Sequence, residues 1–303
     1  MCASDVLCSA VVRPRKPWSR AVCLTVIVMA ASRCGNVNAG LERLSEARDR
    51  SADLIIQFTK AADASDRAVM ADTDELSVAF AREADQARQN VQNDLDVLGP
   101  MLEALGYAGE TRLFQEFTGR YKAYTELDRQ ILELAVENTN LKAQRLSFGP
   151  AQEAADAFRD SIQSLSPADP AGAWHVKALA VTAIASVRDI QSLQAPHIAD
   201  PDDAAMTRFE QRMASSESAA RAALEALPGL IDPPSRPRLA AAGAALDRFM
   251  SIHAQILVLS HRNTNVRSLA MSLDQKRKLV GPCEESLHAL RDALAKRGYP
   301  KGR

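Results

Sequence analysis

The sequence predicts an all-α protein made of two tandem up-down-up-down four-helix-bundle units with long heptad-patterned third helices. The first observation behind this is composition. Aromatic residues make up 5% of the 303 residues, with 13 glycines and 14 prolines, and the chain is rich in Ala, Leu, Glu and Arg, which enter helices at little cost. The second is a heptad ladder of apolar residues over 124–150, and the third is its repetition over 249–273. Short connections between helices of this kind favour antiparallel bundles.

The two ladders match at a constant shift of 125 positions. Each carries an asparagine among its inward positions, Asn138 in the first and Asn263 in the second, within an Asn-Thr-Asn triplet. A buried asparagine can fix helix register, so both are interpreted as buried polar residues that set register or cap a turn, with a ligand contact as the alternative. The outer asparagines are expected to face solvent. The matched apolar positions are Tyr124, Leu127, Ile131, Leu134, Leu141 and Phe148, paired with Phe249, Ile252, Ile256, Leu259, Val266 and Leu273.

The first bundle is expected at 40–166. An Asp- and Thr-containing turn at 71–75 separates its first two helices, and Gly-Pro at 99–100 is expected to break the second. The third helix carries the first ladder and is expected to stop at Gly149. Pro150 suits the first turn of a short fourth helix.

A proline-rich linker at 167–172 is expected to separate this unit from a second bundle at 173–298. If Gly281-Pro282 marks the same turn as the first unit's Gly-Pro pair, the second ladder is longer by one heptad, which keeps its apolar stripe in phase. The third helix of each unit is much longer than the fourth. Either the far end is therefore only three helices thick, or the units pack so that one fills the other's gap.

Residues 1–39 are interpreted as a signal peptide or N-terminal anchor. Basic residues precede an apolar run of about 12 residues, shorter than the ~20 that span a membrane. We expect a periplasmic, exported protein, with an uncleaved inner-membrane anchor as the alternative. Removal of this segment leaves Cys283 as the single cysteine, so no disulfide within the chain is expected. Residues 299–303 form a basic tail.

No catalytic constellation, cofactor motif or metal site is expected from the sequence. Glu285–His288 is an ExxH, half of a di-iron motif, but no other histidine has a carboxylate three residues before it. His197 and His261 are therefore expected to be surface or helix-end residues. Trp174 is expected to anchor the packing between units. A net charge of -1 without basic stripes argues against a nucleic-acid partner.

The segment ILELAVENTNLKAQRLSFGPAQEAADAFRDSI (131–162) resembles the four-helix-bundle sensor domain of methyl-accepting chemotaxis receptors, and the second unit resembles it too. The resemblance covers about 40–300 and implies two tandem copies. In that family the bundle lies outside the inner membrane, dimerises, and binds small molecules directly or through a solute-binding protein. After residue 40 no membrane-spanning relay and no cytoplasmic signalling part are recognised. No family site residue is carried over.

We therefore expect a non-catalytic exported sensor-like module that binds a small-molecule ligand, a solute-binding protein or another partner protein through helix packing. A homodimer or a membrane-receptor partner is expected. The alternative is a structural or interaction protein that dimerises, or docks on a membrane receptor, through its heptad stripes. A ferritin-like metal-dependent enzyme is the third hypothesis, disfavoured by the missing second ExxH.

Overall fold

The computed structural model describes residues 19–298, with side chains from residue 39 onward. Within that range the protein is almost entirely helical, and its β-pairing is a single isolated bridge between Pro167 and Ile231. The fold class is all-α, as the composition and the ladders predict. The α-helices are α1 (Ser19–Met70), α2 (Asp74–Leu105), α3 (Ala108–Glu137), α4 (Thr139–Leu146), α5 (Gln152–Gln163), α6 (Ala173–Ala199), α7 (Asp203–Ala226), α8 (Arg236–Arg262), α9 (Thr264–Met271) and α10 (Arg277–Lys296). Short π-helices η1 (Ser147–Ala151) and η4 (Ser272–Lys276) and 3-10 turns η2 (Pro170–Gly172) and η3 (Pro233–Ser235) connect them.

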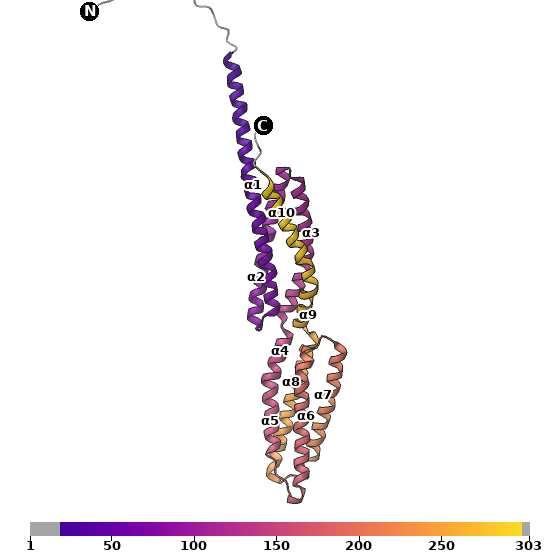
Figure 1. Cartoon of the computed structure of the whole chain (residues 1–303). Coiled ribbons are helices and arrows are strands. Elements are labelled where there is room, and N and C mark those ends of the chain that lie inside the picture. The colour runs from indigo at the N-terminus through magenta and orange to yellow at the C-terminus, as the bar shows by residue number, and fades with distance from the viewer. Residues whose placement is uncertain (1–18, 299–303) are drawn as a thin grey trace, which may run out of the picture.

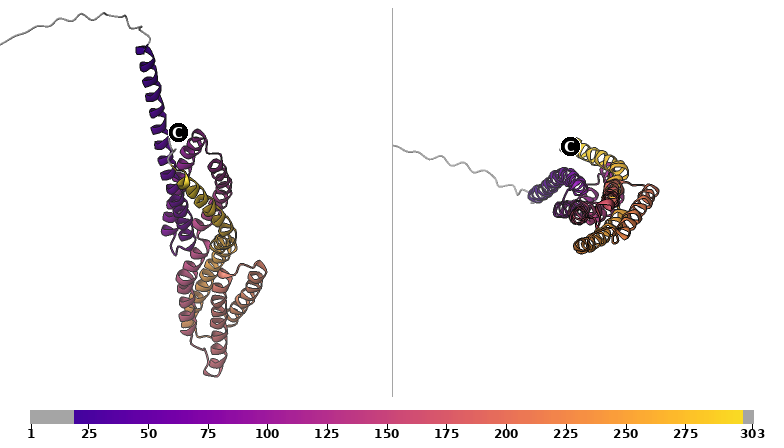
Figure 2. Two further views of the ribbon diagram at one scale, coloured as in Figure 1. Left: turned by 45° about the horizontal axis from the view of Figure 1, so that its top comes forward. Right: turned by 90° about the horizontal axis from the view of Figure 1, so that it is seen from below.

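Two helical bundles lie end to end along one long axis (Figure 1). The upper bundle consists of α1, α2, α3 and α10, and the lower bundle consists of α5, α6, α7 and α8. The chain passes from the upper to the lower bundle after α3 and returns after α8, so α4 and α9 lie at the junction (Figures 1 and 2). The two bundles are thus joined by two antiparallel chain segments.

This packing corrects the expectation of one bundle per sequence unit, 40–166 and 173–298. Each unit contributes three helices to one bundle and its last helix to the other: α10 packs on α1 and α3, and α5 packs on α8 and α6. The linker at 167–172 therefore joins two helices of the lower bundle. The physical reason is that the chain continues past the junction in the same direction, so its last helix covers the apolar faces of the other unit. The observed packing extends the second alternative, because the exchange is reciprocal and the last helix of each unit completes the other's bundle.

The Gly-Pro pairs do not form turns. Gly149 and Pro150 lie within η1, and Gly281-Pro282 and Pro100 lie within α10 and α2. Proline lacks the N–H of the regular helical bond, yet Pro100 and Pro282 lie within α-helices and Pro150 lies within a π-turn. The two π-helices start at Ser147 and Ser272, 125 positions apart. The repeat therefore stays in register through this region, and the expected one-heptad extension is wrong.

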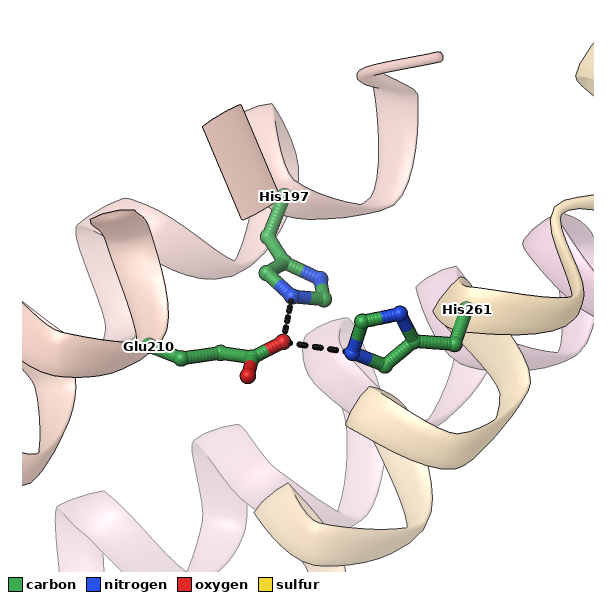
Figure 3. Close-up of side chains that lie close together, drawn as sticks. All are labelled: His197, Glu210 and His261. Atoms are coloured by element: carbon green, nitrogen blue, oxygen red, sulfur yellow. Dashed lines mark hydrogen bonds and ion pairs between the residues drawn. The ribbon is translucent and has the colours of Figure 1, made fainter. Parts of the chain in front are cut away.

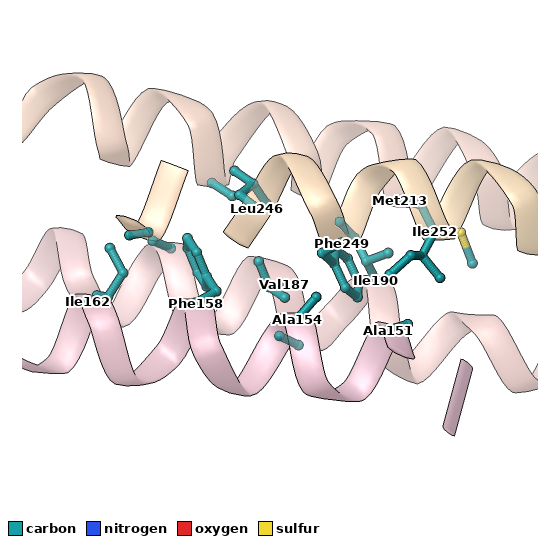
Figure 4. Packing of buried hydrophobic residues seen from close by; sticks show 14 of the residues in the cluster. Ala151, Ala154, Phe158, Ile162, Val187, Ile190, Met213, Leu246, Phe249 and Ile252 are labelled. Carbon is teal, nitrogen blue, oxygen red and sulfur yellow. The ribbon is translucent and has the colours of Figure 1, made fainter. Parts of the chain in front are cut away.

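The two cores differ in kind. The upper core is aromatic, with the ring of Phe58 lying edge-on to Phe117 at 6.0 Å and to Tyr124 at 5.0 Å. The lower core is mainly aliphatic around Phe158 and Phe249 (Figure 4). Burying side chains of this size stabilises each bundle by roughly 1.5–3 kcal/mol per residue. The exchanged helix α10 adds Cys283, Leu287, Leu290 and Leu294 to the upper core.

Trp174 and Cys283 show what burial decides at single residues. Trp174 is 63% exposed at the start of α6, far from the junction, so it does not anchor packing between the units. Cys283 is fully buried, and burial raises the pKa of its thiol to about 11, which keeps it protonated. The thiol is therefore unreactive near neutral pH.

Residues 1–18 of the segment interpreted as a signal peptide or anchor (1–39) lie outside the described residues. From Ser19 the backbone of this segment forms the beginning of α1. The basic tail, 299–303, also lies outside the described residues. Among the described residues, no helix is both long enough and apolar enough to span a membrane.

Candidate functional site

Asn138 and Asn263 lie at the two points where the chain crosses between the bundles. Both have left-handed backbone conformations, with φ of 51° and 50°, and they are the non-glycine residues with positive φ in the described part of the chain. Asparagine is enriched among the non-glycine residues that adopt this conformation. The ladder predicted an uninterrupted third helix through each of them. Instead each asparagine ends one helix and begins the next in a left-handed turn.

The helices that start at these asparagines cap each other. The backbone N–H of Thr139 donates to Thr264 Oγ1, and the N–H of Thr264 donates to Thr139 Oγ1, both at 3.1 Å. In the same way the N–H groups of Asn140 and Asn265 donate to each other's Oδ1 at 3.1 Å. The first N–H groups of a helix have no partner within it. The two N-termini therefore satisfy each other through side-chain oxygens, in a pseudo-twofold arrangement.

The asparagine amides extend this arrangement, but not symmetrically. Asn140 Nδ2 donates to Asn263 Oδ1 at 2.7 Å, and Asn265 Nδ2 donates to Asn138 Oδ1 at 2.8 Å. Asn263 Nδ2 also donates to the Asp200 carbonyl at 2.8 Å, whereas Asn138 Nδ2 is buried without a hydrogen-bond partner among the described residues. Asn140 is 4% exposed, which corrects the expectation that the outer asparagines face solvent. The asparagines at the junction thus make more hydrogen bonds to the lower bundle than to the upper bundle.

A buried charged network lies in the upper bundle beside the junction. Lys276 Nζ, in η4, is 2.8 Å from Asp66 Oδ1 and 3.5 Å from Asp128 Oδ1, and Arg88 is 2.8 Å from Asp128 Oδ2. Ser272 Oγ also donates to Asp66, at 2.7 Å. Burial raises the pKa of Asp128 above its usual value, although Lys276 and Arg88 oppose that shift. The network joins α1, α2 and α3 to the helix that returns from the lower bundle.

The equivalent positions of the lower bundle are neutral. Ser147 of η1 donates to Gln194 at 2.7 Å, as Ser272 does to Asp66, and Gln194 contacts His253 Nδ1 at 3.3 Å. His253 stands 125 positions after Asp128, and Ala151 stands 125 positions before Lys276. Burial lowers the pKa of His253 to about 4, so its ring is neutral at neutral pH. The buried ion pairs are therefore found in the upper bundle and not at the equivalent positions of the lower bundle.

A cavity of 320 Å³ opens beside this network. One wall is the last two turns of α1, and the other is α9, η4 and the start of α10. Asp66, Lys276 and the exposed Arg277 supply its charged groups. The remaining lining residues are Ala62, Val69, Met70, Leu269, Ser272, Leu273 and Val280.

His197 and His261 both lie at helix ends, as expected, but they also meet a carboxylate. His197 lies at the end of α6, but it is fully buried, and His261 approaches it from the end of α8. Both rings contact the carboxylate of Glu210 on α7 (Figure 3). Spacings of 13 and 51 residues on three separate helices form no sequence motif, so only the packing reveals this cluster. The ExxH residues Glu285 and His288 are both exposed.

No family model matches the sequence, and no curated protein matches it. Among solved structures the chain is similar to one described as the crystal structure of the TorS sensor domain–TorT complex in the presence of TMAO. The sequences are 11% identical, the match covers 85% of this chain and 100% of that chain, and the TM-score is 0.41. A likeness of this degree supports no functional conclusion by itself.

Proposed function

We propose that the protein is a non-catalytic, exported, sensor-like module in which a small molecule binds beside the junction and changes how the two bundles pack, as the resemblance to chemotaxis-receptor sensor domains suggests. One observation carries the proposal: the 320 Å³ cavity is bounded by α1 from one sequence unit and by η4 and α10 from the other. A ligand there contacts both units at the point where one enters the other's bundle.

The lining indicates the ligand's chemistry. Val69, Leu269 and Val280 offer an apolar surface, while Arg277 carries an exposed cation and Asp66 a half-exposed carboxylate. Arginine pairs with carboxylates through two parallel hydrogen bonds. A small organic acid or amino acid with an apolar side chain matches this set of groups.

The same site offers a route from binding to packing. A ligand changes a conformational equilibrium only if it binds one state more tightly than the other. Ser272 and Lys276 of η4 donate to Asp66 of α1, so the ammonium group of an amino acid that competes for Asp66, or a carboxylate that competes for Lys276, weakens this contact. The position of η4 against α1, and so of the exchanged helix, would then depend on the ligand.

A thermal-shift screen with small organic acids and amino acids tests the proposal. We expect at least one compound to raise the melting temperature of the wild type. Leu273→Trp, which places a larger side chain at the cavity wall, should abolish that shift. The matched control is Phe148→Trp at the equivalent exposed position of the lower bundle, where the shift should persist. A flat response across the panel, or an equal response in both variants, would count against the cavity.

A partner protein is the second candidate, because Phe148 and Leu273 are 72% and 54% exposed at equivalent positions of the two π-turns. The ladder positions Tyr124 and Ile131 are fully buried inside the upper bundle, which leaves less of the heptad stripe for dimerisation or for docking on a membrane receptor. Sedimentation of the mature chain distinguishes these versions, since a strictly monomeric chain excludes the homodimer. Export itself is tested by fusing residues 1–39 to a reporter that is active only in the periplasm.

A further inference from the structure

His197, Glu210 and His261 bring three potential metal ligands together at the junction end of the lower bundle. Glu210 Oε1 is 2.8 Å from His197 Nε2 and 2.6 Å from His261 Nε2, and the three ligand atoms all lie within 4.8 Å of one another. They come from α6, α7 and α8, and all point to a common centre (Figure 3). We propose that this His–Glu–His cluster binds a divalent transition-metal ion of the zinc type.

The tautomer of His197 supports metal binding. Ser260 Oγ is 2.9 Å from the His197 backbone carbonyl, and since a carbonyl only accepts, the hydroxyl proton is used there. The same Oγ is 2.8 Å from His197 Nδ1, so Nδ1–H is the donor in that contact. In the neutral ring Nε2 then carries a lone pair that faces Glu210. An outer hydrogen bond of this kind orients the histidine ligands of metal sites.

The charges in the cluster favour a cation. Both imidazole rings converge on one oxygen, Glu210 Oε1, at 2.8 Å from His197 Nε2 and 2.6 Å from His261 Nε2. With Nδ1–H donating to Ser260 Oγ, the Nε2 lone pair of the neutral His197 ring faces a carboxylate oxygen, and a metal ion between the two atoms would replace this repulsion with two ligand bonds.

Ligand type and geometry suit zinc. Two imidazoles and one carboxylate are ligands that Zn²⁺ takes, with a fourth position open. Ligand atoms at about 2.1 Å from a tetrahedral ion are about 3.4 Å apart, which is wider than the present contacts. Glu210 and His261 have 30% and 43% exposed side chains, so they can move outward while the buried His197 stays in place.

The cluster is specific to the lower bundle and adjoins the junction. Ile198 and Asp200, just after His197, accept hydrogen bonds from Asn140 and Asn263 through their carbonyls. His261 is two residues before Asn263 in the same chain segment. A metal ion would tie α6, α7 and α8 together where the chain crosses between bundles, and so hold the junction in one arrangement.

The upper bundle offers no equivalent ligand set. The turn at 71–75 recurs at 199–203, a shift of 128 positions, and the ladder recurs at 125. Val69 therefore stands at the place of His197, and Val136 at the place of His261. Both are apolar and at least partly buried. The metal ligands are thus a difference between the two repeats.

Calorimetric titration of the full chain with Zn²⁺ at neutral pH, in a buffer that does not chelate, tests the proposal. We expect one specific site in the wild type and a loss of at least ~10-fold in affinity for His261→Ala, since even outer residues of metal sites are worth about 10–100-fold. His261 is exposed, so this variant should fold normally. Glu210→Gln should weaken binding in the same direction.

The control is His288→Ala, which removes an exposed histidine on α10 and should bind Zn²⁺ as the wild type does. His261→Ala keeps every cysteine of the chain, so the difference between the two variants isolates the cluster from thiol binding elsewhere. Melting curves give a second readout: Zn²⁺ should raise the melting temperature of the wild type and His288→Ala, and not of His261→Ala. Equal affinity in the wild type and His261→Ala, or no binding by the wild type, overturns the proposal.

Discussion

At the residue scale, Asn138 and Asn263 decide where the protein bends. Each combines a left-handed backbone with a buried side chain, and each accepts a hydrogen bond at Oδ1 from an asparagine of the other triplet. Most residues lose about 1–2 kcal/mol in this backbone conformation. The same residue type therefore supplies both the turn and the partner across the junction.

Asn138→Ala should lower the free energy of unfolding by about 2–3 kcal/mol. Alanine is disfavoured in the left-handed backbone conformation, and the substitution also removes a buried hydrogen bond. Asn138→Gly adopts the same backbone freely and should cost less, mainly through the lost hydrogen bond. Urea denaturation of both variants measures the difference. Equal destabilisation by Ala and Gly would mean that the backbone conformation contributes nothing.

At the element scale, η4 is the segment that locks one unit into the other's bundle. Its Lys276 is 2% exposed and reaches the carboxylates of Asp66 and Asp128, and it donates to the Ala62 carbonyl at 3.0 Å. Removing one partner of a buried ion pair costs more than the pair itself contributes, because the remaining charge stays desolvated. The network thus acts mainly by making other packings of η4 unfavourable.

A double-mutant cycle on Asp128→Asn and Lys276→Met measures the energetic coupling between these two residues. Lys276→Met should destabilise by about 3 kcal/mol, and the double variant should lose less than the sum of the single losses by about 1–2 kcal/mol. Arg129→Ala, which removes an exposed ion pair on the same helix α3, should change stability by less than about 1 kcal/mol. If the two buried substitutions were additive, Lys276 and Asp128 would not be energetically coupled.

At the scale of the whole molecule, the exchange of last helices makes the two bundles interdependent. The core of the upper bundle needs Leu287 and Leu290 of α10, and the core of the lower bundle needs Phe158 and Ile162 of α5. Neither sequence unit can therefore bury its own apolar surface completely. This arrangement gives a ligand or metal at the junction influence over both bundles.

Separate fragments 40–166 and 173–298 should each melt without cooperativity or self-associate, because each lacks one helix of its bundle. Mixed, they should form a 1:1 complex that recovers most of the helicity and cooperative melting of the intact 40–298 chain. Size-exclusion chromatography and circular dichroism of the fragments, their mixture and the intact control check this. A monomeric, cooperatively melting 40–166 fragment would contradict the exchanged packing.

Some site residues could be foreseen and others could not. Asn138 and Asn263 stood out because each interrupts an apolar stripe at the same place in both ladders. Lys276 follows Leu269 by seven residues, so heptad spacing places this cation on the buried face of the helix. That spacing is a sequence signal for a buried charge. Nothing in the local sequence marks Glu210 as a neighbour of His197 and His261, because the three meet only through the packing of α6, α7 and α8.

The sequence by itself determined that this chain is all-helical and repeated, since heptad spacing and helix-favouring composition are local properties read along one helix. It also placed the linker turn, the turn at 71–75 and the paired asparagines. Only the tertiary structure decided that each unit gives its last helix to the other bundle. The apolar stripe of α5 or α10 can cover either unit, and the choice depends on whether the chain turns back or continues at the Gly-Pro pairs. That choice is made by packing at the junction, where the reciprocal caps of Thr139 and Thr264 hold the crossing in place.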